Sequence, residues 1–217
     1  MAGRKTVTAA VLITLATAAC AAILILRHRH NDCDDVTVPP LPFSELRDGD
    51  LAFRTGRGNY STILSMKKHH PDTIYFSHTG LVVDIGGGRW RVIHAVPNEP
   101  EFKGDADRVK METLEEFFAP RKASHGALIH TGTVFPRHLV DTAISYVDRK
   151  VRFDSQYMLS DSSKLYCTEF IWRLYKKTGI DLSEGRRSFD FIPIFSEPVI
   201  QPSDLWLYSK KEKYFYY

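Results

Sequence analysis

The chain has 217 residues, of which 43% are hydrophobic and 25% are charged. This composition is typical of a globular protein with a sizeable core and excludes a disordered chain. The net charge of +3 is small, and no block of Lys and Arg is interleaved with aromatic residues. Charge therefore gives no support to a nucleic-acid-binding protein, and that class is set aside.

The first 30 residues contain an apolar segment with basic flanks. Arg4 and Lys5 precede 7-VTAAVLITLATAACAAILIL-26, a run of 20 uncharged residues, and Arg27 follows it. About 20 apolar residues are enough for a helix to cross a bilayer. A cleaved signal peptide is the alternative, because 16-ATA-18 offers small residues after a short apolar stretch. Residues 1–30 are predicted to be a signal or transmembrane anchor, with an uncleaved anchor favoured, which places the remainder in the cell envelope.

A linker and then a single domain are predicted after this segment. Residues 31–43 are polar and then proline-rich, ending in 38-VPPLPF-43, and this composition indicates a stiff spacer. Residues 44–217 are predicted to form one domain. Its first strand is predicted at 49–55, and a short helix at 59–70.

A β-hairpin is predicted next. The segments 74–85 and 89–96 are rich in β-branched and aromatic residues, and 86-GGG-88 lies between them. If the three glycines form the loop, Ile85 pairs with Arg89 and paired residue numbers sum to 174. His78 and His94 then become diagonal neighbours on one face of the hairpin. A two-residue loop would place the two histidines on opposite faces.

The remaining elements follow from caps, turns and apolar spacing. Strands that alternate with helices predict an α+β domain in which an antiparallel sheet packs against helices. The predicted elements are a short helix capped by Thr113 with Glu116, a strand at 125–132, a helix from Pro136 to Lys150, a helix from Leu165 to a cap at Gly179, and a candidate last strand within 201–217.

One cysteine is a candidate nucleophile. Of the three cysteines, Cys20 lies in the apolar run and Cys33 follows it, so Cys167 is alone in the domain. Free cysteine is among the most buried residue types, and inert packing is the default interpretation. However, a thiol in the first turn of a helix faces free backbone N–H groups and the positive end of the helix. These are expected to lower its pKa and to stabilise an oxyanion.

A metal site is the alternative use of the same residues. The Cys167 thiolate, with His78 and His94, could hold zinc, with Asp84 as a fourth ligand. The sequence has no recognisable metal-ligand spacing, so catalysis is favoured and no metal or other cofactor is predicted. A serine hydrolase is not supported, because no G-x-S-x-G motif is present.

Four short motifs resemble a known family. They are 49-GDLAFR-54, 77-SHTGLVV-83, 92-VIHAVP-97 and 166-YCTEFIW-172. Their residues and order resemble the YiiX/YebB-like group of the NlpC/P60 superfamily, which are papain-like cysteine hydrolases with a circularly permuted domain. The resemblance covers roughly residues 45–185. It implies that Cys167 is the nucleophile, that His78 is its general base, and that His94 orients His78. Many relatives carry a glutamate near the position of His94. The histidine in this chain is similar to the residue that the acyltransferase-like branch has at that position.

The family implies cleavage of amide or ester bonds in cell-wall peptides or acylated amines. The leading prediction is therefore a cysteine amidase or peptidase held at the cell envelope, with a peptide or acyl-amine substrate and a membrane contact through residues 1–30. A non-catalytic module of the same fold that binds wall peptides or lipids is the first alternative. Acyl transfer to an amine or lipid is the second.

Overall fold

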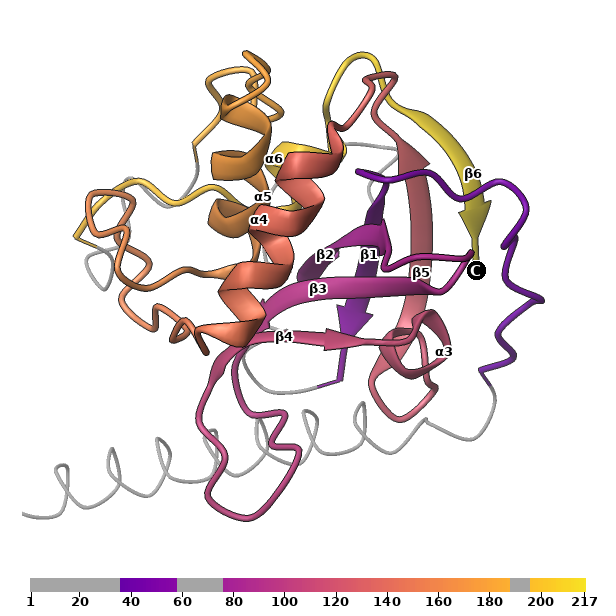
Figure 1. Ribbon diagram of the computed structural model, residues 1–217, viewed down its shortest axis with the longest axis horizontal. Coiled ribbons are helices and arrows are strands. Elements are labelled where there is room, and N and C mark those ends of the chain that lie inside the picture. The colour runs from indigo at the N-terminus through magenta and orange to yellow at the C-terminus, as the bar shows by residue number, and fades with distance from the viewer. Residues whose placement is uncertain (1–35, 58–75, 188–195) are drawn as a thin grey trace, which may run out of the picture. The chain divides into compact units, whose positions relative to one another are not determined.

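The computed structural model describes residues 36–57, 76–187 and 196–217 (Figure 1). Residues 37–217 belong to one compact unit. The predicted anchor at 1–30 and the predicted helix at 59–70 lie outside the described residues. Among the helices that the structure does describe, none has the length and apolar content needed to span a membrane.

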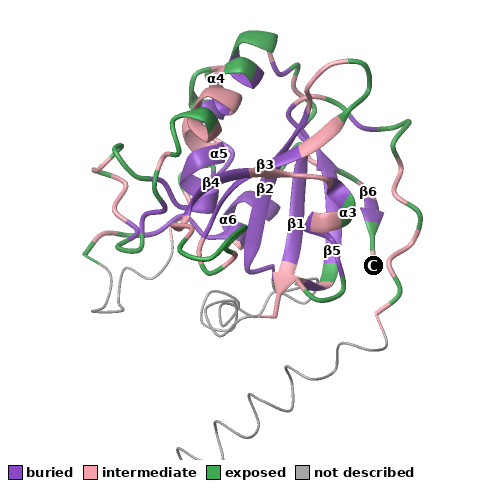
Figure 2. Cartoon of the chain, turned by 60° about the horizontal axis from the view of Figure 1, so that its bottom comes forward, coloured by how far each residue is buried: buried purple, intermediate pink, exposed green. Residues whose placement is uncertain are grey.

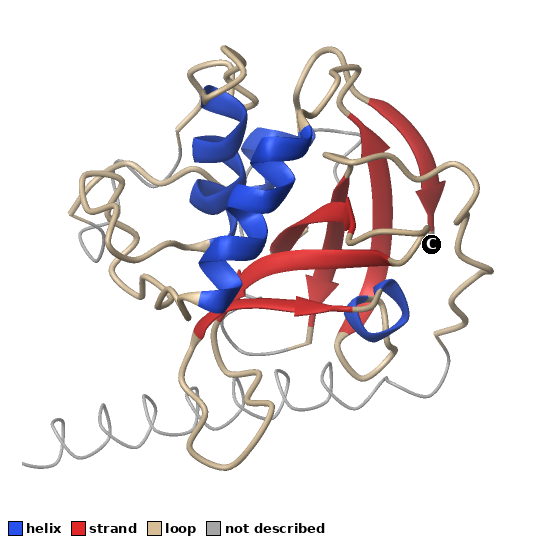
Figure 3. Cartoon of the chain, in the orientation of Figure 1, coloured by secondary structure: helices blue, strands red, loops and turns tan. Residues whose placement is uncertain are grey.

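A six-stranded antiparallel sheet organises the domain (Figure 3). The strand order is β4-β3-β2-β1-β5-β6, so the predicted hairpin and the first strand form the centre. The strands are β1 (Leu51–Gly56), β2 (His78–Asp84), β3 (Trp90–Val96), β4 (Arg108–Glu112), β5 (Ala123–His130) and β6 (Glu212–Tyr216).

Helices cover both faces of this sheet. The larger layer contains α4 and α5, and α3 lies against the opposite face together with the chain before β1 (Figure 1). The α+β prediction is therefore confirmed. The described helices are α3 (Leu114–Phe117), α4 (Arg137–Asp148), α5 (Cys167–Lys176) and α6 (Pro202–Trp206).

The apolar face of α5 fixes this helix on the sheet. Phe170, Ile171, Leu174 and Tyr175 are fully buried and belong to the larger core, as the helical spacing of apolar residues predicts. Each side chain of this size contributes about 1.5–3 kcal/mol when fully buried. Gly179 follows the helix at φ 83°, a conformation that glycine adopts without strain. The start of the helix, with Cys167, is thereby held against the central strands.

A second, smaller core lies on the other face of the sheet. Leu114, Phe117 and Phe118 from α3 and the turn after it pack there, and all three are fully buried. The strands β1 and β2 between the two cores are buried along most of their length (Figure 2). Val38 and Leu41 also pack against the smaller core. The proline-rich stretch at 38–43 thus contacts the domain that it precedes.

The hairpin has the register that a three-glycine loop requires. Leu81 pairs with Ile93 and Asp84 with Trp90, so paired numbers sum to 174. The backbone N–H of Ile85 donates to the carbonyl of Arg89 at 3.2 Å, and the three glycines have φ values of 112°, 69° and 74°. Such positive φ angles are the reason for glycine in this loop. The prediction of register is confirmed.

Other elements differ from their predicted limits. β5 begins at Ala123, two residues before the predicted start. The tail contains a short helix, α6, before β6. β4 was not predicted, because its five residues follow a long polar loop. In the predicted cap of α3, the Thr113 hydroxyl accepts a hydrogen bond from the Glu116 N–H at 3.2 Å, and the Glu116 side chain contacts Arg121 instead of the cap backbone.

Candidate active site

Cys167 is the first residue of α5, and Tyr166 is its N-cap. The sulfur lies at the end of the helix where backbone N–H groups have no partner within the helix. The N–H groups of Thr168, Thr79 and Cys167 itself interact with it. A set of N–H donors around one sulfur is the arrangement that stabilises negative charge on a thiolate or an adjacent oxyanion.

Burial nevertheless dominates the acidity of this thiol. Cys167 is 4% exposed, and its removal from water raises the pKa to about 11, although the surrounding N–H groups oppose the rise. The N–H groups at the helix start do lower this pKa, as expected, but burial has the larger effect and the net shift is upward. Loss of water around a thiolate outweighs the attraction of the helix end. At neutral pH the resting group is therefore a thiol.

The sheet opens beside Cys167. The ladder between β2 and β3 ends at Leu81 and Ile93, whereas β1 pairs with β2 as far as His78. Because the N–H of Val82 donates to Asp50 next to β1, alternation directs the N–H of Thr79 to the other side, toward this opening. The Cys167 sulfur meets that N–H. The thiol thus lies next to the residue that follows His78.

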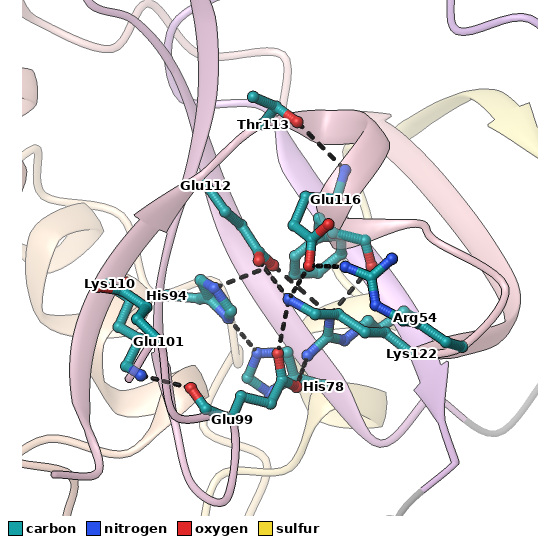
Figure 4. Close-up of polar contacts among 12 residues, drawn as sticks. Arg54, His78, His94, Glu99, Glu101, Lys110, Glu112, Thr113, Glu116 and Lys122 are labelled. Atoms are coloured by element: carbon teal, nitrogen blue, oxygen red, sulfur yellow. Dashed lines mark hydrogen bonds and ion pairs between the residues drawn. The ribbon is translucent and has the colours of Figure 1, made fainter. Parts of the chain in front are cut away.

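His78 and His94 meet on the opposite face of the sheet from the larger helical layer. Nε2 of His78 lies 2.7 Å from Nδ1 of His94, and both side chains are buried (Figure 4). The diagonal contact predicted from the register is therefore present. In the part of the chain that the structure describes, no hydrogen bond joins the Cys167 sulfur to the His78 ring. Catalytic contacts of this kind are often long before substrate binds.

Burial, with a contribution from nearby charges, keeps His78 neutral. Burial lowers the pKa of His78 well below its usual value, and Arg54, His94 and Lys122 add to the effect. Arg54 is 2% exposed, pairs with His78 across β1 and β2, and donates to the Phe117 carbonyl at 3.0 Å. A neutral imidazole beside a protonated thiol can act as a general base.

Glu112 extends the histidine pair across the sheet (Figure 4). Nε2 of His94 lies 3.2 Å from Oε1 of Glu112. Burial opposes ionisation of Glu112, but contacts with His94, Lys122 and Arg54 outweigh it and lower the pKa to about 2. The sequence reasoning did not single out this residue, because the length of the loop before β4 does not reveal the register of that strand.

Gly80 makes room for this arrangement. A Cβ atom at this position would lie 2.3 Å from Cγ1 of Val92 and 3.3 Å from Cβ of His94. It would also lie 3.3 Å from the ring of Phe117, which packs against both histidine rings. Neighbouring side chains thus fill the space beside Gly80, and only glycine fits there.

Three other polar side chains have structural roles. Glu169 accepts hydrogen bonds from the Tyr166 N–H at 3.3 Å and from Arg173 at 2.7 Å. The Tyr166 hydroxyl accepts a bond from the Ile200 N–H at 3.2 Å. Asp84 accepts bonds from Gly86 and Gly88 in the hairpin loop, at the other end of β2 from His78. Asp84 therefore does not join a site with the two histidines.

A second buried imidazole contacts a carboxylate elsewhere in the domain. Nδ1 of His130 lies 2.8 Å from Oδ1 of Asp50, and the Tyr214 hydroxyl donates to Oδ2 of Asp50 at 2.7 Å. The His130 ring stacks on Tyr214 with centroids 4.0 Å apart. A pocket of about 340 Å³ lies beside this pair and is also lined by Arg47 and residues 131–135.

A solved structure shares this architecture. The crystal structure of metalloprotein yiiX from Escherichia coli O157:H7 is similar to the chain with a TM-score of 0.60 and 19% identity. The match covers 78% of this chain and 96% of that one. The fold is YiiX-like. No protein-family model matches the sequence, and no curated protein matches it. The resemblance inferred from the four motifs is therefore supported at the level of a YiiX-like fold.

Proposed function

We propose that the protein is a cysteine hydrolase of the permuted papain-like type that cleaves amide bonds in cell-wall peptides or acylated amines. The observation that carries the proposal is the His78 contact: its Nε2 is held by His94, which leaves its Nδ1 as the nitrogen that we assign to the proton transfer with the thiol. The Cys167 sulfur beside Thr79 supplies the thiol. A nucleophile, a base and a residue that orients the base are the recurring parts of such sites.

The proposed reaction begins from a neutral pair. When a substrate carbonyl reaches the sulfur, the thiol proton passes to Nδ1 of His78 and an S–C bond forms. Backbone N–H groups at the start of α5 stabilise the oxyanion. His78 then gives its proton to the leaving amine as the C–N bond breaks. Water attacks the resulting thioester, His78 takes its proton, and the acid is released with the thiol restored.

Metal chemistry has no part in this proposal. The YiiX structure is described as that of a metalloprotein. Over the described ranges 36–57, 76–187 and 196–217, no group of three or more His, Cys, Asp or Glu side chains is arranged to hold a metal ion. His78 and His94 direct nitrogens at each other. The residues described here do not fit a metal, and no step is assigned to one.

The competing interpretation is a non-catalytic module, and the burial of the thiol favours it. The test is turnover of fluorogenic N-acyl aminocoumarin amides by the full chain and by Cys167→Ala. The proposal requires that the variant falls to background with an unchanged melting temperature. Turnover that persists in Cys167→Ala would contradict it. An added amine acceptor in the same assay distinguishes hydrolysis from acyl transfer through the products formed.

The cellular location is part of the proposal. Residues 1–30 combine an apolar run with basic flanks, which supports an anchor or export signal that places the domain in the cell envelope. Fractionation of cells that produce the full chain, or a chain without residues 1–30, tests this. Recovery of both chains in the same soluble fraction would contradict an anchor.

A further inference from the structure

His78, His94 and Glu112 form one diagonal line across three neighbouring strands. His94 lies opposite Lys110 on β4, so Glu112 is its diagonal neighbour on that side. His78 is its diagonal neighbour on β2, by the same offset of two residues. The two contacts use the two different nitrogens of His94: Nδ1 faces His78 at 2.7 Å, and Nε2 faces Glu112 at 3.2 Å.

When the imidazoles of His78 and His94 are both neutral, only one placement of their two protons is compatible with both contacts. An ionised carboxylate accepts hydrogen bonds and cannot donate one. A lone pair on Nε2 of His94 would be repelled by the negative Oε1 3.2 Å away, so Nε2 carries the proton and Nδ1 has a free lone pair. That lone pair accepts a hydrogen bond from the Nε2–H of His78, which leaves Nδ1 of His78 unprotonated. The negative charge of Glu112, acting through His94, thus leaves His78 with a nitrogen that can accept the thiol proton.

We propose that Glu112 is a positioning residue that sets the tautomers of both histidines, so that Nδ1 of His78 is the free base. The inference rests on the proposed function in taking His78 as the base for Cys167. Glu112 touches neither the sulfur nor His78, and it acts through His94. Without its charge, His94 can place its proton on Nδ1, and His78 must then place its own proton on the nitrogen that should receive the thiol proton.

The surroundings of Glu112 keep it ionised. Lys122 contacts Oε2 of Glu112, and Nη1 of Arg54 lies 3.6 Å from Oε1. These cations also disfavour positive charge on His78. The ionised carboxylate therefore favours the tautomer of His94 that carries its proton on Nε2.

Glu99 offers a matched control. It forms ion pairs with the same two cations, Arg54 and Lys122, and it lies in the loop before β4. Its ion-pair partners in the described residues do not include a histidine. Glu99→Gln removes one negative charge from the same cluster and leaves the contact between His94 and Glu112 intact. A purely structural effect of losing a carboxylate would appear in both variants.

The test combines two readouts on the full chain labelled with ¹⁵N-histidine. Imidazole ¹⁵N shifts report the tautomers of His78 and His94, and turnover of the aminocoumarin amides reports catalysis. In the wild type and in Glu99→Gln, both rings should carry the proton on Nε2. In Glu112→Gln, the rings should show mixed tautomers, and turnover should fall by about 10²- to 10³-fold. In a Ser-His-Asp triad, loss of the residue that fixes the tautomer of the base lowers turnover by about 10⁴-fold. A smaller loss is expected here because Glu112 acts on the base through His94. Glu112→Asp, which keeps the charge, should retain the wild-type tautomers.

Two results would overturn the inference. One is that Glu112→Gln retains both Nε2–H tautomers, and the other is that Glu99→Gln and Glu112→Gln lose turnover equally. The two arms also separate this inference from the proposed function. If the tautomers shift in Glu112→Gln but wild-type turnover does not depend on Cys167, the positioning role stands as a property of the histidine pair and the proposed hydrolase activity fails.

Discussion

Two buried imidazoles in this domain each contact a carboxylate, and their surroundings differ. His94 contacts Glu112 within a cluster that contains Arg54 and Lys122, and these contacts lower the pKa of Glu112 to about 2. His130 contacts Asp50, whose other side-chain partner is the Tyr214 hydroxyl. Burial raises the pKa of Asp50, although hydrogen bonds from His130 and Tyr214 oppose the rise.

The difference lies in what each pair can act on. His94 and Glu112 form a line with His78, and the N–H of Thr79, the next residue in the chain, contacts the Cys167 sulfur. The Glu112 carboxylate in this line stays ionised. The pair of His130 and Asp50 is connected to an aromatic ring and a surface pocket, and the one free cysteine that the structure describes lies elsewhere, at the start of α5. A buried histidine with a carboxylate is therefore a poor sign of catalysis unless a nucleophile is within reach.

The largest expected effect separates the two imidazoles directly. His78→Gln should reduce turnover of the aminocoumarin amides by at least about 10³-fold, since the thiol loses its base. His130→Gln should leave turnover within about twofold, because it touches no part of the proposed mechanism. Steady-state kinetics of both variants, with melting temperatures as the control for folding, provide the measurement. Equal losses of turnover in His78→Gln and His130→Gln would contradict the assignment of His78 alone as the base.

The next effect concerns the thiol. Because burial raises the pKa of Cys167 to about 11, the thiolate fraction should rise tenfold with each pH unit below that value. Alkylation of Cys167 by iodoacetamide should therefore accelerate about 100-fold between pH 7 and pH 9. A rate that is flat across this interval would indicate a thiolate that already exists at neutral pH, paired with a protonated His78.

The two carboxylates should have opposite effects on stability as the pH changes. For Glu112 the folded pKa of about 2 lies below the ordinary 4.5, so the unfolded chain binds more protons between these values. Its contribution, on the order of 3 kcal/mol, is present above pH 4.5 and is lost as the pH falls toward 2. For Asp50 the folded pKa is raised above 3.8, so its ionisation costs stability as the pH rises from that value.

Chemical denaturation between pH 2 and pH 7 measures both effects. The stability difference between the wild type and Glu112→Gln should shrink as the pH is lowered. The difference between the wild type and Asp50→Asn should change with the opposite sign. Parallel curves for the two variants would show that the two carboxylates have similar surroundings after all.

The smallest expected effect concerns the space between the histidines. Gly80→Ala should lower the free energy of unfolding by about 1–3 kcal/mol, because its Cβ overlaps Val92 and crowds His94. The displaced His94 ring should also lower turnover. A matched change is Gly87→Ala in the hairpin loop, where a Cβ meets nothing within 4 Å but the φ of 69° is unfavourable for alanine. That variant should lose stability without losing turnover.

The sequence predicted the part of the site that local rules determine. Three consecutive glycines determine the loop, the loop determines the register, and the register places His78 beside His94. The apolar spacing of α5 likewise places Cys167 at a helix start that packs on the sheet. These inferences need only neighbours in the chain or in one hairpin.

What the sequence did not reveal depends on distant segments. Glu112 joins His94 because the chain returns after the loop at 97–107 to form β4, and no local pattern gives that register. The raised pKa of Cys167 depends on how much water the packed domain excludes, which the position of one residue in a helix does not show. In the sequence, Arg54 has the pattern of an ordinary charged residue near the end of a strand. Its burial beside His78 follows from the fold alone.

The central claim is that Cys167 becomes acylated with the help of His78. The most direct measurement is peptide mapping by mass spectrometry after the full chain reacts with an activated acyl ester and is quenched in acid. The account predicts a single acyl group on Cys167 in the wild type, and a much slower appearance of that adduct in His78→Gln. Acylation at another residue, or at Cys167 with the same rate in His78→Gln, would contradict it.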